Sequence, residues 1–460
     1  MAIRYSYAFL AAGVALGCLI QPVSAKTLQV GTCTTNPRQY TTIQAAVNAA
    51  NPGDRVQVCP GSYPEQVVIS QAMTLENVTG QASPTVTVPA GGVVKNTETL
   101  SGFPTAAQIL VAPTTAATVN VENIVVDGTG NNDTSCGLEL IGIYYQNAGG
   151  TISGDTAQNQ LLPPDYQGCQ DGEGIFVENQ TSGTTRVKIT NNTVTNFDKN
   201  GITVSYGAAN VQIENNTVTG LGPTDVIAQN GIQLGYGATG TISGNQVSEL
   251  IYTPETYGSS GILLYNTQVG GSVAAPKVTN NTVNTSQYGI VLDAVDGAAN
   301  GMVQVKSNTV SGATFAGIGL YTDGINDDFI KVLSNTVSGT SLYDDIDVCS
   351  DNNQIKNNIV TDATEAGIHL DGECTESNST TSGVGNSVAS NQIDNNCVGI
   401  LSGPVQGQNN ISNGNHFTGN TNNYIYGSDT FTCGPTQHHA PAGTKTGATG
   451  QRVVIQPRGM

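Results

Sequence analysis

The sequence is poor in charge, in cations and in aromatic residues. Of its 460 residues only 11% are charged and 5% are aromatic, and Trp is absent. The 15 Lys and Arg face 34 Asp and Glu, which gives a formal net charge of −19. So few cations argue against a nucleic-acid-binding protein, which needs a basic face. Glu, Lys, Leu and Ala are not enriched together, so a coiled coil or helical bundle is also excluded.

What the sequence does contain is typical of a β-rich protein with many turns. Gly is abundant, at 56 residues, and Asn, Thr and Val recur along the chain. Apolar residues make up 38% and recur in order, which argues against a disordered chain. Val and Thr favour strands, whereas Gly and Asn favour turns. The chain length would allow several domains, but the repeat described below favours one long domain.

Residues 1–25 have the pattern of a secretory signal peptide. Arg4 supplies the positive charge, residues 8–20 form the apolar stretch, and Val23-Ser24-Ala25 is a small-residue cleavage site. We therefore expect a mature chain that begins at Lys26 and is secreted to the periplasm or the exterior. An alternative in which Cys18 is acylated fits the pattern less well. No later segment is long and apolar enough to span a bilayer.

Eight cysteines remain after the signal peptide, and an even number in an exported protein indicates disulfides. The sequence leaves many connectivities open. Pairing of nearest neighbours predicts four bonds: Cys33–Cys59, Cys136–Cys169, Cys349–Cys374 and Cys397–Cys433. A zinc site is not favoured, because no two cysteines have C-x-x-C spacing.

Two sequence marks alternate from about residue 120 to 420, with periods of about 22 to 32 residues. The first mark, Gly-Ile-x-(Val/Leu/Tyr), begins at Gly142, Gly174, Gly201, Gly231, Gly261, Gly289, Gly317, Gly367 and Gly399, with Asp345-Ile346-Asp347-Val348 as a variant. The second mark, Asn-x-(Val/Ile/Phe), begins at Asn192, Asn216, Asn245, Asn281, Asn308, Asn335, Asn358, Asn391 and Asn415.

Within each period, short runs alternate between apolar and polar residues, as Val303 to Lys306 do. Such runs are strands with one buried face, and no room is left between them for helices. Strands that recur in this way must stack on their equivalents in the next period, which predicts an all-β parallel β-helix solenoid with about 4.8 Å between coils. We expect about ten coils over residues 55–425. The Asn of the second mark should sit at a bend, tolerate a left-handed backbone and bond to its neighbours in a ladder.

The start of the solenoid carries a resemblance to a known family. Residues 41–50 have helical spacing, with Ile43, Ala46 and Val47 on one face, and strands follow at 55–58 and 66–69. The run YTTIQAAVNAANPGDRVQVCPGSYPEQVVI resembles the N-terminal cap of secreted right-handed parallel β-helix proteins of the pectin-lyase-like superfamily. The organisation that follows is a signal peptide at 1–25, an N-terminal cap with first strands at 26–70, repeats at 71–425, and a flexible tail at 426–460.

The resemblance implies a fold but transfers no catalytic residue, because the superfamily mixes lyases, hydrolases, epimerases, adhesins and inactive members. Polygalacturonase-like enzymes carry Asn-Thr-Asp, Asp-Asp and Gly-His-Gly blocks. This chain has Asp327-Asp328 and Asp344-Asp345 without either partner block. Pectate-lyase-like sites use Arg or Lys beside acidic calcium ligands, and no such motif is present.

The alternation of strand side chains nevertheless predicts which residues of the Gly-Ile strands point outward. Asp347, His369 and Asp371 fall in neighbouring outward positions of the C-terminal coils, and we expect a catalytic group there. Asp347 and Asp371 should be roughly 8 Å apart, the range of an inverting glycosidase. Tyr265, Asp293 and Tyr321 share an outward column and are candidates for sugar binding. The competing interpretation is an ordinary solvated surface.

A third outward set consists of Asp323, Asp351 and Glu373. Stacked carboxylates repel one another, and a bound Ca²⁺ would remove that repulsion, so these residues are candidate calcium ligands.

Two function classes remain open. One is a secreted monomeric enzyme, a polysaccharide lyase or glycoside hydrolase that acts on a glycan along the solenoid. The other is a non-catalytic, adhesin-like binding protein.

Overall fold

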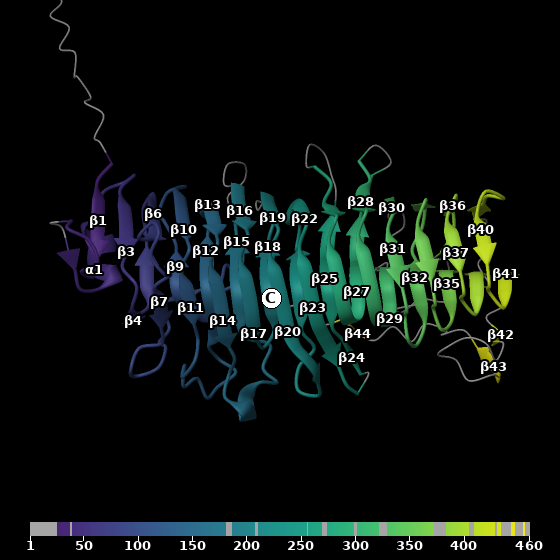
Figure 1. The fold of residues 1–460 in the computed structure, drawn as a ribbon, viewed down its shortest axis with the longest axis horizontal. Helices are drawn as coiled ribbons and strands as arrows, with labels where there is room; N and C mark the ends of the chain where they lie inside the picture. The colour runs from purple at the N-terminus through teal and green to yellow at the C-terminus, as the bar shows by residue number, and fades with distance from the viewer. Residues whose placement is uncertain are drawn as a thin grey trace, which may run out of the picture.

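The computed structural model is a stack of β-coils, seen side by side in Figure 1 from α1 (Ile43–Ala49) at one end to β41 (Asn422–Tyr426) at the other. The structure describes residues 25–433, 443–446 and 454–455, apart from 37–38, 181–185, 208–209, 255, 269–273, 299–300, 322–328, 372–382, 404–408 and 428–429. Within these residues α1 is the only α-helix, and η1 (Pro164–Tyr166) is a single 3-10 turn. None of the described helices is long and apolar enough to cross a membrane.

One sheet of 15 strands forms a complete side of the solenoid, which we call face A. Apart from β2 (Gln39–Tyr40), its strands follow one another in parallel, one for each coil. They are β1 (Thr27–Val30), β3 (Arg55–Val58), β6 (Met73–Asn77), β10 (Thr118–Glu122), β13 (Gly149–Ser153), β16 (Arg186–Thr190), β19 (Asn210–Glu214), β22 (Thr239–Ser243), β26 (Lys277–Thr279), β28 (Val303–Lys306), β30 (Ile330–Leu333), β33 (Gln354–Lys356), β36 (Ser387–Ala389) and β39 (Asn410–Ile411).

A second sheet, of 25 strands, covers the other two sides. The Gly-Ile strands form face B: β5 (Val67–Ile69), β9 (Pro104–Val111), β12 (Glu139–Gln146), β15 (Glu173–Glu178), β18 (Asn200–Ser205), β21 (Asn230–Gly235), β25 (Ser260–Gln268), β32 (Asp344–Cys349), β35 (Ala366–Leu370), β38 (Val398–Ser402) and β41. The strands after each Asn mark form face C: β4 (Ser62–Pro64), β7 (Thr85–Thr87), β11 (Val125–Asp127), β14 (Thr156–Gln160), β17 (Thr193–Phe197), β20 (Thr217–Thr224), β23 (Gln246–Tyr252), β31 (Thr336–Ser338), β34 (Ile359–Thr361), β37 (Gln392–Asp394) and β40 (His416–Thr418). β27 (Thr282–Asp296) and β29 (Thr309–Tyr321) run through both faces, and β8 (Thr97–Glu98) pairs antiparallel with β9.

The predicted all-β parallel β-helix is therefore confirmed. The estimate of about ten coils over residues 55–425 was too low, because face A contains 13 strands, β3 to β39, in that range. The undercount came from the first coils, where neither sequence mark is present.

The first sequence mark has a packing cause. Its Ile side chains are fully buried and stack in one column, as Ile202 on Ile232 and Ile262 show. The preceding glycine lets face C approach closely. A Cβ on Gly201 would lie 2.4 Å from Cγ1 of Val218, closer than carbon atoms can pack. Glycine is thus required at this position by space.

The second mark builds the predicted asparagine ladder. The Nδ2 of each Asn donates to the Oδ1 of the Asn in the next coil, at 2.9 to 3.0 Å, in eight unbroken links from Asn192 to Asn415. Each Oδ1 also accepts the backbone N–H of the preceding Asn, as Asn308 does from Asn281 at 2.9 Å. We expected the ladder Asn itself to have the left-handed backbone. The left-handed residue is instead the one before it, such as Asn280 (φ 57°). The turn therefore needs two specialised residues, one for its backbone and one for its side chain.

The ladder begins on an aspartate. Asp155 accepts the N–H of Ile124 at 2.7 Å, and its own N–H donates to Asn192. Burial raises the pKa of Asp155 well above its ordinary value. The protonated carboxyl has nearly the shape of the asparagine side chain that it replaces, with one donor where the amide has two.

The ends of the described chain are closed by short elements. Thr42 caps α1, and both carboxylate oxygens of Glu65 accept N–H groups from its first turn, at 2.7 and 2.8 Å. Ile43, Ala46 and Val47 are buried as the helical spacing predicted. In the segment expected as a tail, β42 (Thr430–Cys433) pairs with β43 (Gly443–Thr446), and β44 (Val454–Ile455) pairs with β24 (Tyr257–Gly258).

Three of the predicted disulfides are confirmed: Cys33–Cys59, Cys136–Cys169 and Cys397–Cys433. Their Cα atoms lie 5.2 to 5.7 Å apart, as a disulfide requires. Cys349 is disulfide-bonded, and its predicted partner Cys374 lies outside the described residues. The signal peptide falls almost wholly outside them as well.

The ladder predicts a large loss of stability for a small substitution. Asn308→Ala would remove the acceptor of the Asn281 N–H and the donor to the carbonyl of Val278, and both groups are buried. We expect the free energy of unfolding to fall by about 2–4 kcal/mol, measured by denaturant titration. The control Asn284→Ala removes an exposed Asn that bonds only Ser311, so its loss should stay below about 0.5 kcal/mol. Equal losses in the two variants would contradict a structural role of the ladder.

Candidate active site

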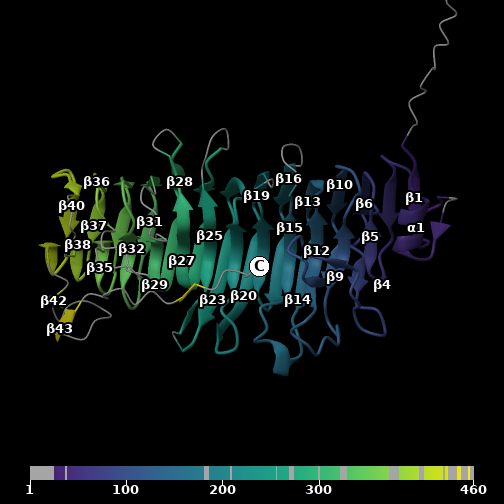
Figure 2. The ribbon, with the colours of Figure 1, turned by 180° about the vertical axis from the view of Figure 1, so that it is seen from behind.

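The predicted outward columns of face B are those of the structure. Asp347 pairs directly with His369 across β32 and β35, and Gly319 and Leu401 continue the same column on either side. Figure 2 shows β29, β32, β35 and β38 as consecutive strands in this half of the solenoid. The register therefore brings Asp347 and His369 into adjacent coils, as predicted.

His369 does not use Asp347 as its hydrogen-bond partner. Its Nδ1 lies 3.0 Å from Oδ2 of Asp344, and both side chains are almost fully buried. The other oxygen of Asp344 accepts the N–H of Ala366 at 2.8 Å. The Nε2 of His369 is buried and has no hydrogen-bond partner among the residues that the structure describes. Within these residues the imidazole is thus held at one nitrogen.

Asp344 is a site residue that the sequence analysis missed. It begins β32 and pairs with Ala316, three residues before Asp347. Regular alternation of side chains along the strand would place Asp344 and Asp347 on opposite sides. The strand departs from that alternation at Asp345, the position that holds Gly in the other copies of the first sequence mark. The signal was present in the Asp344-Asp345-Ile346-Asp347 run, where acidic residues replace the usual Gly-Ile mark.

Asp347 and Asp371 converge on the same region. Tyr321 donates its hydroxyl to Oδ2 of Asp347 at 2.9 Å. One carboxylate oxygen of Asp347 and one of Asp371 lie within 4.8 Å of each other, and the sulfur of Cys349 lies beside both. The separation is smaller than the backbone estimate of 8 Å because the two side chains lean together. Asp347 is half-exposed, whereas Asp371 is buried.

The shared environment changes both titrations in the same direction. Burial and the nearby charge of Asp344 raise the pKa of Asp347 to about 8. Burial alone would lower the pKa of His369, but the charge and the hydrogen bond of Asp344 outweigh it and raise that pKa well above its ordinary value. Both shifts favour the protonated forms, a neutral carboxyl at Asp347 and an imidazolium at His369. Such a pair provides a proton donor and a fixed positive charge.

The predicted sugar-binding residues share one column but differ in exposure. Tyr265 pairs with Asp293, and Asp293 pairs with Tyr321. Asp293 and Tyr321 are buried, so only Tyr265 offers a partly exposed ring. Tyr206 and Tyr236, which the sequence analysis missed, extend that ring into a row with centroid separations of 6.4 and 5.5 Å. Tyr206 directly follows β18 and Tyr236 directly follows β21, so both lie just beyond the last outward residue of a face B strand.

The predicted calcium ligands are only partly described. Asp323 and Glu373 lie outside the described residues, and Asp351 is buried with its Oδ1 accepting the N–H of Val384 at 2.8 Å. Asp344, Glu365 and His369 have ligand atoms within 4.8 Å of one another and could hold a cation. Their closest contact, between His369 and Asp344, is a hydrogen bond.

A second buried charged cluster lies on face B near β15 and β18. Lys199 is fully buried, donates to the carbonyl of Ala228 at 2.8 Å, and has its pKa lowered to about 7 by burial. Burial also raises the pKa of its neighbour Glu173. The sequence analysis assigned neither residue, because neither belongs to a recognisable motif.

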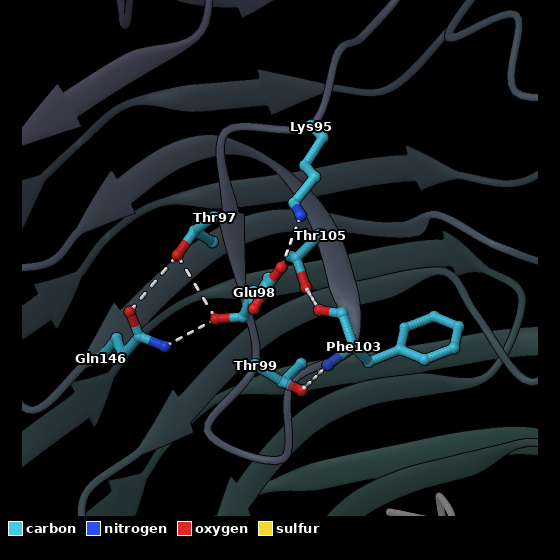
Figure 3. Close-up of polar contacts among 7 residues, drawn as sticks. All are labelled: Lys95, Thr97, Glu98, Thr99, Phe103, Thr105 and Gln146. Carbon is cyan, nitrogen blue, oxygen red and sulfur yellow. Dashed lines mark hydrogen bonds and ion pairs between the residues drawn. The ribbon is translucent and has the colours of Figure 1, made fainter.

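The N-terminal part of face B is covered by the segment around β8. Figure 3 shows Gln146 donating to the carbonyl of Glu98, at 2.7 Å, and Lys95 paired with the Glu98 carboxylate at 2.6 Å. The same segment donates the Leu100 N–H to Glu178, which also accepts the hydroxyl of Tyr144. Glu178 is therefore engaged in hydrogen bonds that hold the segment around β8 in place.

Comparisons with known proteins agree with this architecture. Residues 141–330 match the family model of the right-handed beta helix region. A comparison with curated proteins finds no match. Among solved structures, the Dettilon tailspike protein is similar at 16% identity, over 84% of this chain and 68% of that chain, with a TM-score of 0.51.

Two epimerases are also similar in structure. The periplasmic alginate epimerase AlgG is 12% identical over 82% of this chain and 84% of its own, with a TM-score of 0.50. The A-module of the mannuronan C-5 epimerase AlgE4 of Azotobacter vinelandii is 13% identical over 87% and 94%, with a TM-score of 0.47. The coils, their register and the match to this family model over residues 141–330 together show that the chain has the fold of a right-handed parallel β-helix.

Proposed function

We propose that the protein is an exported glycoside hydrolase that cleaves a polysaccharide on face B, over β29, β32 and β35. The observation that carries the proposal is the position of Asp347, which accepts the hydroxyl of Tyr321, pairs with His369 in the next coil and has its pKa raised to about 8. A carboxyl group that keeps its proton near pH 7 is the general acid that glycoside hydrolysis needs.

In the proposed mechanism Asp347 protonates the glycosidic oxygen as the bond to the sugar breaks. Asp371 is the second carboxylate, and the short separation of the two groups favours the retaining geometry over the inverting one. Asp371 then forms the glycosyl–enzyme bond, and water, deprotonated by Asp347, releases the sugar. His369 keeps a positive charge near both groups, which favours the ionised form of Asp371.

A lyase reaction is less well supported by the same geometry. A lyase needs a base that removes a proton from the sugar ring, and a histidine held in its protonated form by Asp344 does not accept one. The tyrosine row at Tyr206, Tyr236 and Tyr265 supports a glycan substrate in either case, since such rings pack against sugars.

Export is supported by the three disulfides, which persist in oxidising compartments. The alginate epimerase with a similar fold is periplasmic by its name and acts on a polysaccharide, which agrees with the proposal.

One observation favours a second candidate, a non-catalytic glycan-binding protein. His369 and Asp371 are 1% and 4% exposed, and buried charged groups are often structural. A screen for reducing sugars released from plant, algal and bacterial polysaccharides separates the two candidates, because a binding protein releases none.

The proposed general acid predicts a specific loss of activity. Asp347→Asn should lower kcat by at least about a hundredfold on whichever polysaccharide the screen identifies, with the fold intact by circular dichroism. Asp362→Asn is the matched control, because Asp362 is exposed and its left-handed backbone suits Asn. An Asp347→Asn variant that keeps full activity would refute the assignment.

The proposed charge of His369 is measurable without a substrate. In protein labelled with ¹⁵N-histidine, the His369 nitrogens should have imidazolium shifts at pH 7.5, because Asp344 raises its pKa. In Asp344→Asn the largest contribution that raises the pKa of His369 is lost while burial still lowers it, so the pKa should fall and the neutral fraction of the ring at that pH should rise. A group whose pKa is raised on folding stabilises the folded state most at pH values below the pKa that it has in the unfolded chain. Asp344→Asn should therefore lower the free energy of unfolding more at pH 6 than at pH 10. A neutral His369 in the unmodified protein would contradict the proposal.

A further inference from the structure

The cations of the coils are gathered on one side of the solenoid. Between residues 186 and 356 the chain has seven Lys and Arg, and one of them, the buried Lys199, lies outside face A, directly before β18. The other six lie in face A strands and alternate with buried apolar residues, so they point outward: Arg186, Lys188, Lys277, Lys306, Lys331 and Lys356. A protein with net charge −19 thus presents a basic strip on face A.

Four of these lysines are spaced at the coil-to-coil distance of the solenoid. Lys277 on β26 and Lys331 on β30 occupy one outward column, and Lys306 on β28 and Lys356 on β33 occupy the next. One lysine therefore appears in each of four consecutive coils, about 4.8 Å apart along the axis and alternating between two columns.

The four charges are not neutralised by neighbouring acids. The strands β26, β28, β30, β33 and β36 contain no Asp or Glu, and none of the four lysines forms an ion pair within the described part of the chain. Lys277 and Lys306 are exposed, and Lys331 and Lys356 are half-buried along their stems. By contrast, Lys188 nearer the N-terminus lies 3.5 Å from Glu214.

Face A is also hollowed where the cations lie. A hollow of about 320 Å³ is lined by Lys277, Gln304 and Lys331, with Met302 in its wall. A second hollow of about 510 Å³ is lined by Arg186 and Lys188 with neighbouring amide and hydroxyl groups. Between the lysines the two columns hold Gln304 and Leu333, and Gln354 and Thr279 lie at their ends. The two amides and the hydroxyl can exchange hydrogen bonds with sugar hydroxyls.

We propose that face A binds a linear carboxylated polysaccharide along the solenoid axis, across Lys277, Lys306, Lys331 and Lys356. A polymer with one carboxylate on each sugar matches a strip with one cation in each coil. The described face A strands β26 to β36 contain no aromatic residue, so the base stacking that single-stranded nucleic acids need is missing there. This site is separate from Asp347 on face B, and the proposal does not depend on catalysis there.

The test compares two double variants that lose the same charge. Lys277→Gln/Lys331→Gln removes two cations from face A, whereas Lys26→Gln/Lys95→Gln removes two elsewhere. With polygalacturonate as the probe, in calorimetry at low salt, the first variant should bind about tenfold more weakly than the unmodified protein, and the second should bind nearly as well. A Lys277→Arg/Lys331→Arg variant keeps the charge and should keep the affinity.

Two further probes define what would overturn the proposal. Fully methyl-esterified polygalacturonate lacks the charge and should bind at least about tenfold more weakly than the free acid, and raised salt should weaken the binding of the acid. The proposal fails if ester and acid bind alike, if the two Gln variants bind alike, or if a single-stranded DNA binds as tightly as polygalacturonate with the same dependence on Lys277 and Lys331. The catalytic proposal is tested by the kcat of Asp347→Asn and this proposal by the binding of the face A variants, so either proposal can fail without the other.

Discussion

The structure depends on the hydrogen bonding of each coil to the next in a fixed register. Backbone ladders do this along all three faces, and the asparagine ladder does it at the corner between faces A and C, where the backbone turns and has no strand partner. Buried N–H and carbonyl groups at that corner would otherwise be left unpaired, at a cost of about 1–3 kcal/mol each. With the corner satisfied, residues about 25 positions apart in sequence become neighbours, and every functional surface of the protein is a column of such neighbours.

This constraint explains why much of the site could be predicted. Once a Gly-Ile mark fixes which residue points inward, the outward columns follow from alternation alone, and the pairing of Asp347 with His369 is an example. Asp344 could not be predicted in the same way, because it lies before the irregular step of the strand. Burial was equally out of reach, since His369 and Asp293 lie in outward columns and are nevertheless covered. The backbone conformation of the turn was misplaced by one residue, because Asn is suited both to the left-handed position and to the ladder.

The two polar faces of the solenoid differ in the way they treat charge. Face B buries acidic groups with His369 and Lys199, and burial shifts the pKa values of Asp347 and Lys199 toward neutrality. Between β26 and β33 face A presents lysines at the coil spacing, and these strands contain no Asp or Glu. Shifted titrations suit proton transfer, whereas exposed cations suit the binding of an anionic polymer. A single fold can carry both because its faces share only the apolar interior.

The central claim is that the coil register keeps Asp347 protonated near neutral pH beside His369. The most direct measurement is the ¹³C NMR titration of the Asp347 carboxyl carbon, assigned by its absence from the Asp347→Asn variant. Our account predicts a titration midpoint near pH 8, because burial and the charge of Asp344 raise the pKa of Asp347 to about that value. A midpoint near pH 4, the ordinary range of an aspartate, would contradict it.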